Sequence, residues 1–234
     1  MEALTTMNSA AAFLNILQSV DAFFPVGAFT LSNGLEDYVI GERLTGSDEL
    51  RQYLEGFMQL FPYNDLGILS LAYTHYSDMQ YITELDGIAA ATKSACEVRT
   101  GTMRMCARYL KARKAMGDCR GQLEKYAEVI AKEEAFGIHA IALGIYGAEV
   151  KIGQDALLLM YGYSVLSAIV NNAVKLVPLS QTEGQKILYE CMGGMESLAE
   201  RAAHMDLTEI GISGAAYEIH CMNHENLYSR QYSS

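Results

Sequence analysis

Two histidines near the C-terminus are spaced so that they could hold a metal ion. His220 and His224 lie four residues apart, and Glu225 follows the second. Residues i and i+4 share one face of a helix, so the two imidazoles could bind a soft or borderline metal. Two ligands are too few for a closed site, however, and a polar tail that binds other proteins explains the same residues. A small helical metalloenzyme centred here is therefore the least favoured hypothesis.

Three other charged residues could carry function. Glu97 and Arg99 lie two positions apart within a predicted helix, where an ion pair with another helix or with a partner is favoured over acid–base catalysis. Lys175 ends an apolar helix, where a cation suits the negative end of the helix dipole or could supply a functional charge. The chain has no P-loop, H-E-x-x-H or G-x-S-x-G signature, so no enzyme class is indicated.

The composition is that of a folded helical protein. Half of the 234 residues are hydrophobic and 19% are charged, the opposite of a disordered chain. Proline is rare, with 3 residues, and tryptophan is absent, while methionine numbers 12. This balance favours helix over strand. The net charge of −11 would repel a phosphate backbone, so we expect no nucleic-acid partner.

The cysteines and the apolar runs indicate the cellular compartment of the protein. The five cysteines are odd in number and none has C-x-x-C spacing, which indicates reduced, buried thiols. No basic stretch followed by an apolar run opens the chain, so we predict no signal peptide. No apolar run reaches about 18 residues, so we expect no membrane-spanning helix and a cytoplasmic protein.

Apolar periodicity predicts a single all-α domain over residues 1–234, a bundle of about ten helices. Residues 1–12 are expected to be a flexible N-terminus, and residues 223–234 a polar C-terminal tail. A capping-box pattern at Thr83 predicts a long helix that runs to Met116. Small residues between positions 137 and 148 predict a close approach of two helices, inside the protein or at a dimer surface.

The segment Phe24–Glu36 is the least ordinary stretch of the sequence. Gly27 permits a tight turn after Pro25, and Thr30 or Ser32 could then cap the helix that follows. A buried turn that leads into a helix explains most of these residues. It does not explain why a carboxylate ends the segment.

This segment resembles the signature of the UreF family of urease accessory proteins, roughly L-P-V-G-A-F-S-x-S-x-G-L-E. Here it reads F-P-V-G-A-F-T-L-S-N-G-L-E. Glu97-x-Arg99 and His139-x-x-x-x-Gly144 resemble the family's E-x-R and H-P-x-x-x-G. Residues 173–185 resemble A-V-R-L-x-P-L-G-Q-T-x-G-Q, with Ser180 in place of a glycine. Residues 224–234 resemble H-E-T-Q-x-x-R-L-F-R-S, with one basic residue fewer.

The resemblance implies an all-α, dimeric, non-catalytic chaperone. It would bridge the accessory protein UreD (also called UreH) and the GTPase UreG, so that nickel is loaded into apo-urease. No cofactor of its own is expected, because nickel would be handled only transiently by the complex. The alternative is a regulator of the UreG GTPase, with Arg99 or Lys175 acting as a finger on the γ-phosphate.

The resemblance also implies which residues matter. The tail around Arg230 and Tyr232 would serve the UreD contact, while Glu36, Glu97, Arg99 and Lys175 would be shared functional charges. The full set of motif or partner-binding positions is Pro25, Gly27, Phe29, Ser32, Gly34, Glu36, Glu97, Arg99, His139, Lys175, Pro178, Gln181, Gln185, His224, Glu225, Arg230 and Tyr232. No catalytic or metal-binding residue is predicted.

Overall fold

The computed structural model describes residues 2–233, with side chains from Ala10 onward. Within this range every regular element is helical, which confirms the all-α prediction. The α-helices are α1 (Glu2–Val20), α2 (Leu35–Ile40), α3 (Ser47–Leu60), α4 (Asp65–Thr74), α5 (Met79–Ala91), α6 (Cys96–Ala115), α7 (Gly121–Ala131), α8 (His139–Glu149), α9 (Gln154–Leu176), α10 (Gln181–Ala203) and α11 (Ala215–Asn223). Short 3-10 helices are η1 (Ala28–Thr30), η2 (Phe61–Tyr63), η3 (Leu207–Glu209) and η4 (His224–Asn226).

The long helix predicted from Thr83 to Met116 is wrong. α5 begins four residues earlier, where the Asp78 side chain accepts from the backbone N–H of Tyr81. The Thr83 hydroxyl instead donates to the Met79 carbonyl inside the helix. The chain then breaks at residues 92–95 and restarts as α6, so this stretch forms two helices.

The ends of α9 and α10 follow their sequence signals. α9 ends at Leu176, because the residue before Pro178 is excluded from helical backbone angles. α10 then begins with Ser180 as its cap, and the Ser180 hydroxyl accepts from the backbone N–H of Glu183 at 3.1 Å. The two helices pack along each other, and α9 also contacts η1 and α2 of the segment Phe24–Glu36.

The small residues of 137–148 serve packing inside the molecule. α8 is buried from His139 to Ala148 and packs on α4. A side chain at Gly144 would come within 2.6 Å of the Leu69 carbonyl oxygen and 2.9 Å of Ala72. The glycine therefore lets the two helix backbones touch, and this stretch is no dimer surface.

α9 is long and apolar enough to cross a membrane by length and mean hydropathy alone, contrary to the run-length argument from sequence. Half of the residues in its most apolar stretch of 18 residues are buried inside the protein. The helix also packs against α10, α4 and α1. These contacts are typical of the central helix of a helical domain, which is the place the sequence predicted for it.

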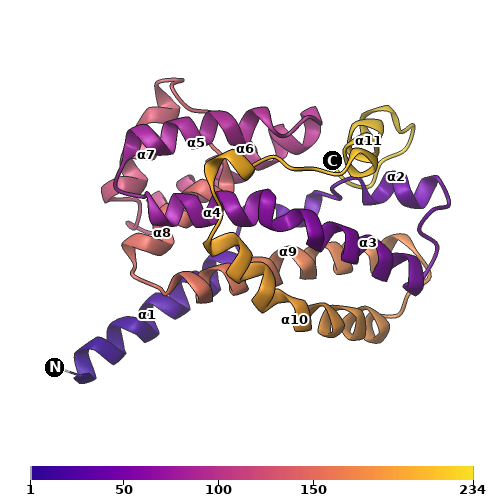
Figure 1. Ribbon diagram of the computed structural model, residues 1–234, viewed down its shortest axis with the longest axis horizontal. Helices are drawn as coiled ribbons and strands as arrows, with labels where there is room; N and C mark the ends of the chain where they lie inside the picture. The colour runs from indigo at the N-terminus through magenta and orange to yellow at the C-terminus, as the bar shows by residue number, and fades with distance from the viewer. Residues whose placement is uncertain (1, 234) are drawn as a thin grey trace.

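The two ends of the molecule are built from different elements. Figure 1 shows α1 projecting from the body at one end, while α2, α11 and the C-terminus gather at the other. The predicted flexible segment 1–12 is helical from Glu2 onward, and its motion stays a prediction. Met1 and Ser234 lie outside the described residues. The gathering of α2, α11 and the tail is where the motif residues meet.

Candidate functional site

The turn between α1 and α2 is built on two glycines with left-handed backbone angles. Gly27 has φ +81° and Gly34 has φ +79°, a region that side-chain-bearing residues rarely adopt. The guanidinium of Arg108 packs against Gly27, where a β-carbon would overlap it. Gly34, and not Thr30 or Ser32, occupies the cap position of α2, so the capping prediction is wrong. The turn brings Glu36 to the first helical turn of α2.

Glu36 is buried, with 4% of its surface exposed, and lies in the middle of a set of donors. Its carboxylate accepts from the backbone N–H of Gln231 at 2.7 Å and of Tyr232 at 3.1 Å. The same carboxylate lies 3.0 Å from Nε2 of His224. A buried carboxylate is tolerated only when it is hydrogen-bonded or paired, and here the C-terminal tail supplies the partners.

His224 joins two carboxylates that are far apart in the sequence. The side chain is fully buried, and its Nδ1 lies 2.6 Å from Glu97 of α6 while Nε2 faces Glu36 of α2. Arg230 forms an ion pair with the other oxygen of Glu97. The chain Glu36–His224–Glu97–Arg230 therefore ties α2, α6 and the tail together, and we call these four residues the tail lock.

The last residues of the tail close on η1 and α9. The backbone N–H of Ser233 donates to the Thr30 carbonyl at 2.8 Å. Tyr232 is 8% exposed, and its hydroxyl lies 3.4 Å from the carbonyl of Asn172. The Asn172 amide in turn donates to the Leu31 carbonyl at 2.9 Å. The tail is thus packed against the N-terminal motif.

The second histidine of the pair has its own partners. His220 Nδ1 lies 2.6 Å from Asp37, and its Nε2 lies 3.2 Å from the guanidinium of Arg43. The ring also packs on Tyr38, with centroids 3.6 Å apart. The four ring nitrogens of His220 and His224 are thus directed at four different side chains. Among the described residues no three His, Cys, Asp or Glu side chains are arranged to hold a metal ion.

Several predicted positions lie outside the tail lock. Arg99 donates to the Lys93 carbonyl at 2.7 Å, so it fixes the loop before α6 and does not pair with Glu97. Lys175 is exposed and has no carboxylate within ion-pair distance in the described part of the chain. Ser32 is buried, as is Gly34 at the cap of α2. The remaining predicted positions on the surface are Pro25, Phe29, Pro178, Gln181, Gln185 and Glu225.

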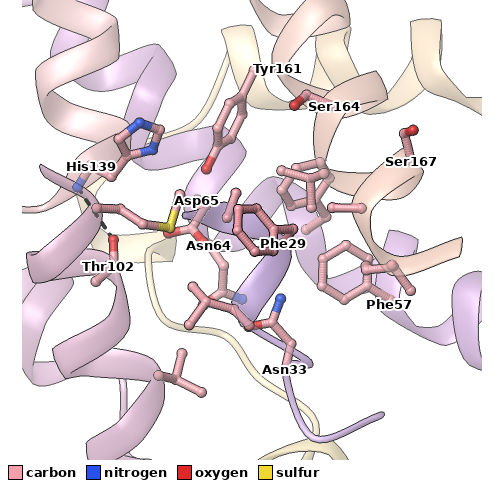
Figure 2. Close-up of a pocket in the computed structure, with 18 of the residues that line it drawn as sticks. Phe29, Asn33, Phe57, Asn64, Asp65, Thr102, His139, Tyr161, Ser164 and Ser167 are labelled. Atoms are coloured by element: carbon pink, nitrogen blue, oxygen red, sulfur yellow. Dashed lines mark hydrogen bonds between the residues drawn. The ribbon is translucent and has the colours of Figure 1, made fainter. Parts of the chain in front are cut away.

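A cavity of about 590 Å³ lies beneath the N-terminal motif. Figure 2 shows His139 and Tyr161 at one end of it and Phe57 and Ser167 at the other. Both ring nitrogens of His139 are buried, with no hydrogen-bond partner among the side chains described from Ala10 onward. Burial lowers the pKa of His139 to about 4, so its imidazole is neutral at physiological pH. The cavity also reaches Lys175.

Sequence reasoning missed some of the residues that hold the site. Asn172 connects the motif to the tail, and Asp37 holds His220. The signal for Asn172 is present in the sequence, because an amide within a helix that is otherwise apolar must find a partner when buried. Arg108 gives no such signal, since its contact with Gly27 depends on how α6 crosses the turn.

Comparison with known proteins decides the family. The family model described as UreF matches residues 44–192 of this chain. The urease accessory protein UreF of Actinobacillus pleuropneumoniae serotype 5b (strain L20) is 32% identical over 222 residues, covering 94% of this chain and 97% of its own length. That of Haemophilus influenzae (strain PittGG) is 31% identical over 233 residues, covering 98% and 99%. The chain belongs to the UreF family of urease accessory proteins.

Membership of the UreF family confirms the resemblance found in the sequence motifs. The model match ends before the tail and begins after the segment Phe24–Glu36, but the full-length relatives extend over both. Streptococcus salivarius (strain 57.I) also has a UreF protein that is 28% identical over 225 residues, covering 95% of this chain and 94% of its own length. The UreF family is a family of accessory proteins and not of enzymes, and in this structure the tail lock holds α2, α6 and the tail together.

Proposed function

We propose that this UreF family member is a maturation scaffold that bridges UreD (UreH) and the GTPase UreG, so that nickel is inserted into apo-urease. The observation that carries the proposal is the tail lock. Three motif segments, which are separated by as many as 196 residues, meet in the tail lock. A partner that contacts this end of the molecule therefore meets α2, α6, α9 and the tail at once.

The surface of the tail suits a protein contact. Arg230 is 40% exposed at its side chain even while paired with Glu97, and Tyr228 beside it is fully exposed. Arginine and tyrosine at the centre of an interface contribute more binding energy than most residues. We assign the UreD contact to this end, in agreement with the role that the resemblance gives to Arg230 and Tyr232.

Co-expression tests the scaffold. We expect tagged chain to capture both UreD and UreG, with no turnover of any substrate by the chain alone. Tyr228→Ala should weaken UreD capture without unfolding the chain, because its side chain makes no buried contact. The matched control is Tyr189→Ala, an aromatic residue that is 76% exposed on α10, away from the tail. If neither partner is captured by the wild-type chain, the scaffold proposal fails.

Nickel enters this proposal as cargo and not as a resident cofactor. Metal that must be handed on is best bound weakly, and the more plausible ligands for the transfer lie on the GTPase partner. The free thiols of the described chain are consistent with a reducing compartment, so we place the complex in the cytoplasm. Equilibrium dialysis of the isolated chain against nickel checks this: tight, stoichiometric retention would contradict it.

A second candidate function is regulation of the UreG GTPase, and Lys175 favours it. Its ammonium group is exposed and unpaired among the described residues, whereas Arg99 is engaged by backbone carbonyls. A cation supplied in trans stabilises the charge that develops on a transferring phosphoryl group. We expect Lys175→Ala to lower any stimulation of GTP hydrolysis, with Lys151→Ala as the exposed control. An unchanged rate in every mixture would exclude this role.

We also propose that two copies pair through the apolar face of α1 and α9. Phe13, Leu14 and Leu17 of α1 are 46%, 62% and 46% exposed, and Leu159 and Tyr163 of α9 are 37% and 45% exposed. Apolar residues gathered on packed neighbouring helices mark an interaction surface. Sedimentation analysis should show a dimer that Leu14→Glu dissociates. A monomeric wild-type chain at high concentration would contradict this.

A further inference from the structure

α6 carries a concentration of positive charge that the tail lock does not use. Six of the chain's 17 lysines and arginines lie within the 20 residues of this helix, against a single carboxylate, Glu97, in its first turn. Arg104, Arg108, Lys111 and Lys114 are all exposed. Their spacing of three or four residues places them along one side of the helix. We call these four residues the α6 stripe.

The stripe is not neutralised by the protein itself. Among the side chains that the structure describes, from Ala10 to Ser233, no carboxylate lies within ion-pair distance of any of its four cations. Arg108 makes one further contact, a hydrogen bond from its guanidinium to the Val26 carbonyl at 3.2 Å. Some other cations are paired: the half-buried Arg51, for example, contacts three carboxylates. In a chain of net charge −11, four unpaired cations along one helix are a local concentration of positive charge.

Like charges at these spacings repel each other and lower the stability of a helix by a few tenths of a kcal/mol per pair. A carboxylate-rich partner that lies along the helix would remove this repulsion and gain ion pairs. Arg104 and Lys114 are separated by ten residues, roughly 15 Å along the axis, which matches about three turns of a second helix. The complementary surface is therefore a helix with carboxylates one turn apart.

An exposed aromatic residue extends the surface. Phe23 is 93% exposed and lies three residues before Val26, the residue whose carbonyl Arg108 holds. An apolar anchor beside a charged row is the usual arrangement of a protein interface, in which the anchor supplies affinity and the charges supply orientation. A long polyanion such as nucleic acid would instead meet the acidic remainder of the surface beyond this short row.

We propose that the α6 stripe, with Phe23 at its side, is a docking surface for an acidic helical segment of a partner protein. The stripe shares no residue with the tail lock. The proposal does not depend on the identity of the partners proposed above. The surface takes up a helix whose carboxylates pair with Arg104, Lys111 and Lys114. Arg108 contributes less, because part of its guanidinium already holds the N-terminal turn.

The test uses the full chain and a labelled helical peptide of alanine and glutamate, with glutamates one turn apart. Its control is the same peptide with glutamine in place of glutamate. We expect binding of the first peptide only, with an affinity that falls as salt rises. The variant Arg104→Glu, Lys111→Glu, Lys114→Glu should weaken this binding roughly tenfold or more. Phe23→Ala should weaken it less.

The matched variant Lys125→Glu, Lys132→Glu, Lys151→Glu changes the net charge equally at exposed positions outside the stripe. Unchanged peptide binding by this variant supports the docking surface. If this variant loses as much affinity as the stripe variant, the overall charge of the protein explains the binding and the proposal is overturned. Absence of peptide binding at low ionic strength also overturns it. Two other outcomes would assign the surface to another occupant and reject the acidic helix. One is tighter binding of a single-stranded oligonucleotide or of phosphatidylserine vesicles than of the peptide. The other is self-association of the chain that the stripe variant loses.

Discussion

Nε2 of His224 lies 3.0 Å from the carboxylate of Glu36, although 188 residues separate them in the chain. This contact explains why a carboxylate ends the N-terminal motif. Glu36 is there to accept the tail: the imidazole on one side and two backbone N–H groups on the other. Neither segment can bury its polar groups without the other, so the two ends of the chain are stabilised together.

The first prediction concerns His224→Ala. Removing the imidazole leaves Glu36 and Glu97 without the group that joins them, and leaving a buried charge without its partner costs about 3 kcal/mol. We expect the free energy of unfolding to fall by that amount in urea titrations. Amide exchange should become faster over residues 227–233 before it does so in α8, because the tail is held by this lock.

Glu225→Ala is the control for that variant. Its side chain is exposed and follows His224 directly, so the change should stay within about 0.5 kcal/mol of wild type. An equal loss in both variants would mean that the short η4 helix, and not the tail lock, is the sensitive element. Unaltered tail exchange in His224→Ala would contradict the prediction outright.

The second prediction concerns Gly27→Ala. The backbone at this position has φ +81°, which costs an L-residue about 1 kcal/mol, and the new methyl group would overlap the Arg108 guanidinium. Gly117→Ala separates these two effects, because Gly117 has φ +72° and nothing within 4 Å of a β-carbon. Thermal unfolding should show a larger loss at position 27 than at 117. Equal losses would show that Arg108 simply moves aside.

The third prediction concerns the contact of α4 and α8. Gly144→Ala should destabilise the protein by about 2 kcal/mol, since the methyl group forces apart the backbones at Leu69 and Ala72. Gly87→Ala in α5 is the control, with no neighbour within 4 Å, and should stabilise by up to about 1 kcal/mol through helix propensity. Urea titrations that give both variants the same sign would contradict this account.

Much of the fold is predictable because its signals are local. Ser180 caps α10 and Pro178 follows the end of α9, as short-range sterics and hydrogen bonding require. The break between α5 and α6 has no such signal, since neither proline nor glycine stands at residues 92–95. There Lys93 is buried and held by Asp65 at 2.7 Å, so a tertiary contact decides where the helix stops.

In the site, too, local sequence signals identified residues, whereas tertiary packing decided their contacts. The motif letters predicted that Glu36, Glu97, His224 and Arg230 matter, but they could not say that these residues touch. His220 and His224 share helical spacing, which suggested one joint metal site. The structure turns them to different carboxylates, because Asp37 and Glu36, though adjacent on α2, face different directions. Which partner each imidazole finds depends on the packing of α11 against α2.

The last prediction concerns His139 and pH. Burial holds the pKa of its imidazole at about 4, whereas in the unfolded chain it returns to its ordinary value of about 6.5. Between these values the unfolded state binds more protons than the folded state, so stability is full above the unfolded pKa and is lost as pH falls towards 4. Integrating this difference gives a loss of about 2 kcal/mol between roughly pH 7 and pH 4.5.

His139→Phe keeps an aromatic ring against Tyr109, whose centroid lies 5.4 Å away, and removes the two unpartnered nitrogens. The variant should therefore match or exceed wild-type stability near neutral pH, and its advantage should grow as the solution is acidified. The comparison isolates this histidine because the rest of the chain is the same in both proteins. His204→Phe, at an exposed position on the end of α10, should leave the wild-type pH profile unchanged. Parallel profiles for wild type and His139→Phe would show that the buried imidazole takes up its proton in the folded state as readily as in water, which its complete burial argues against.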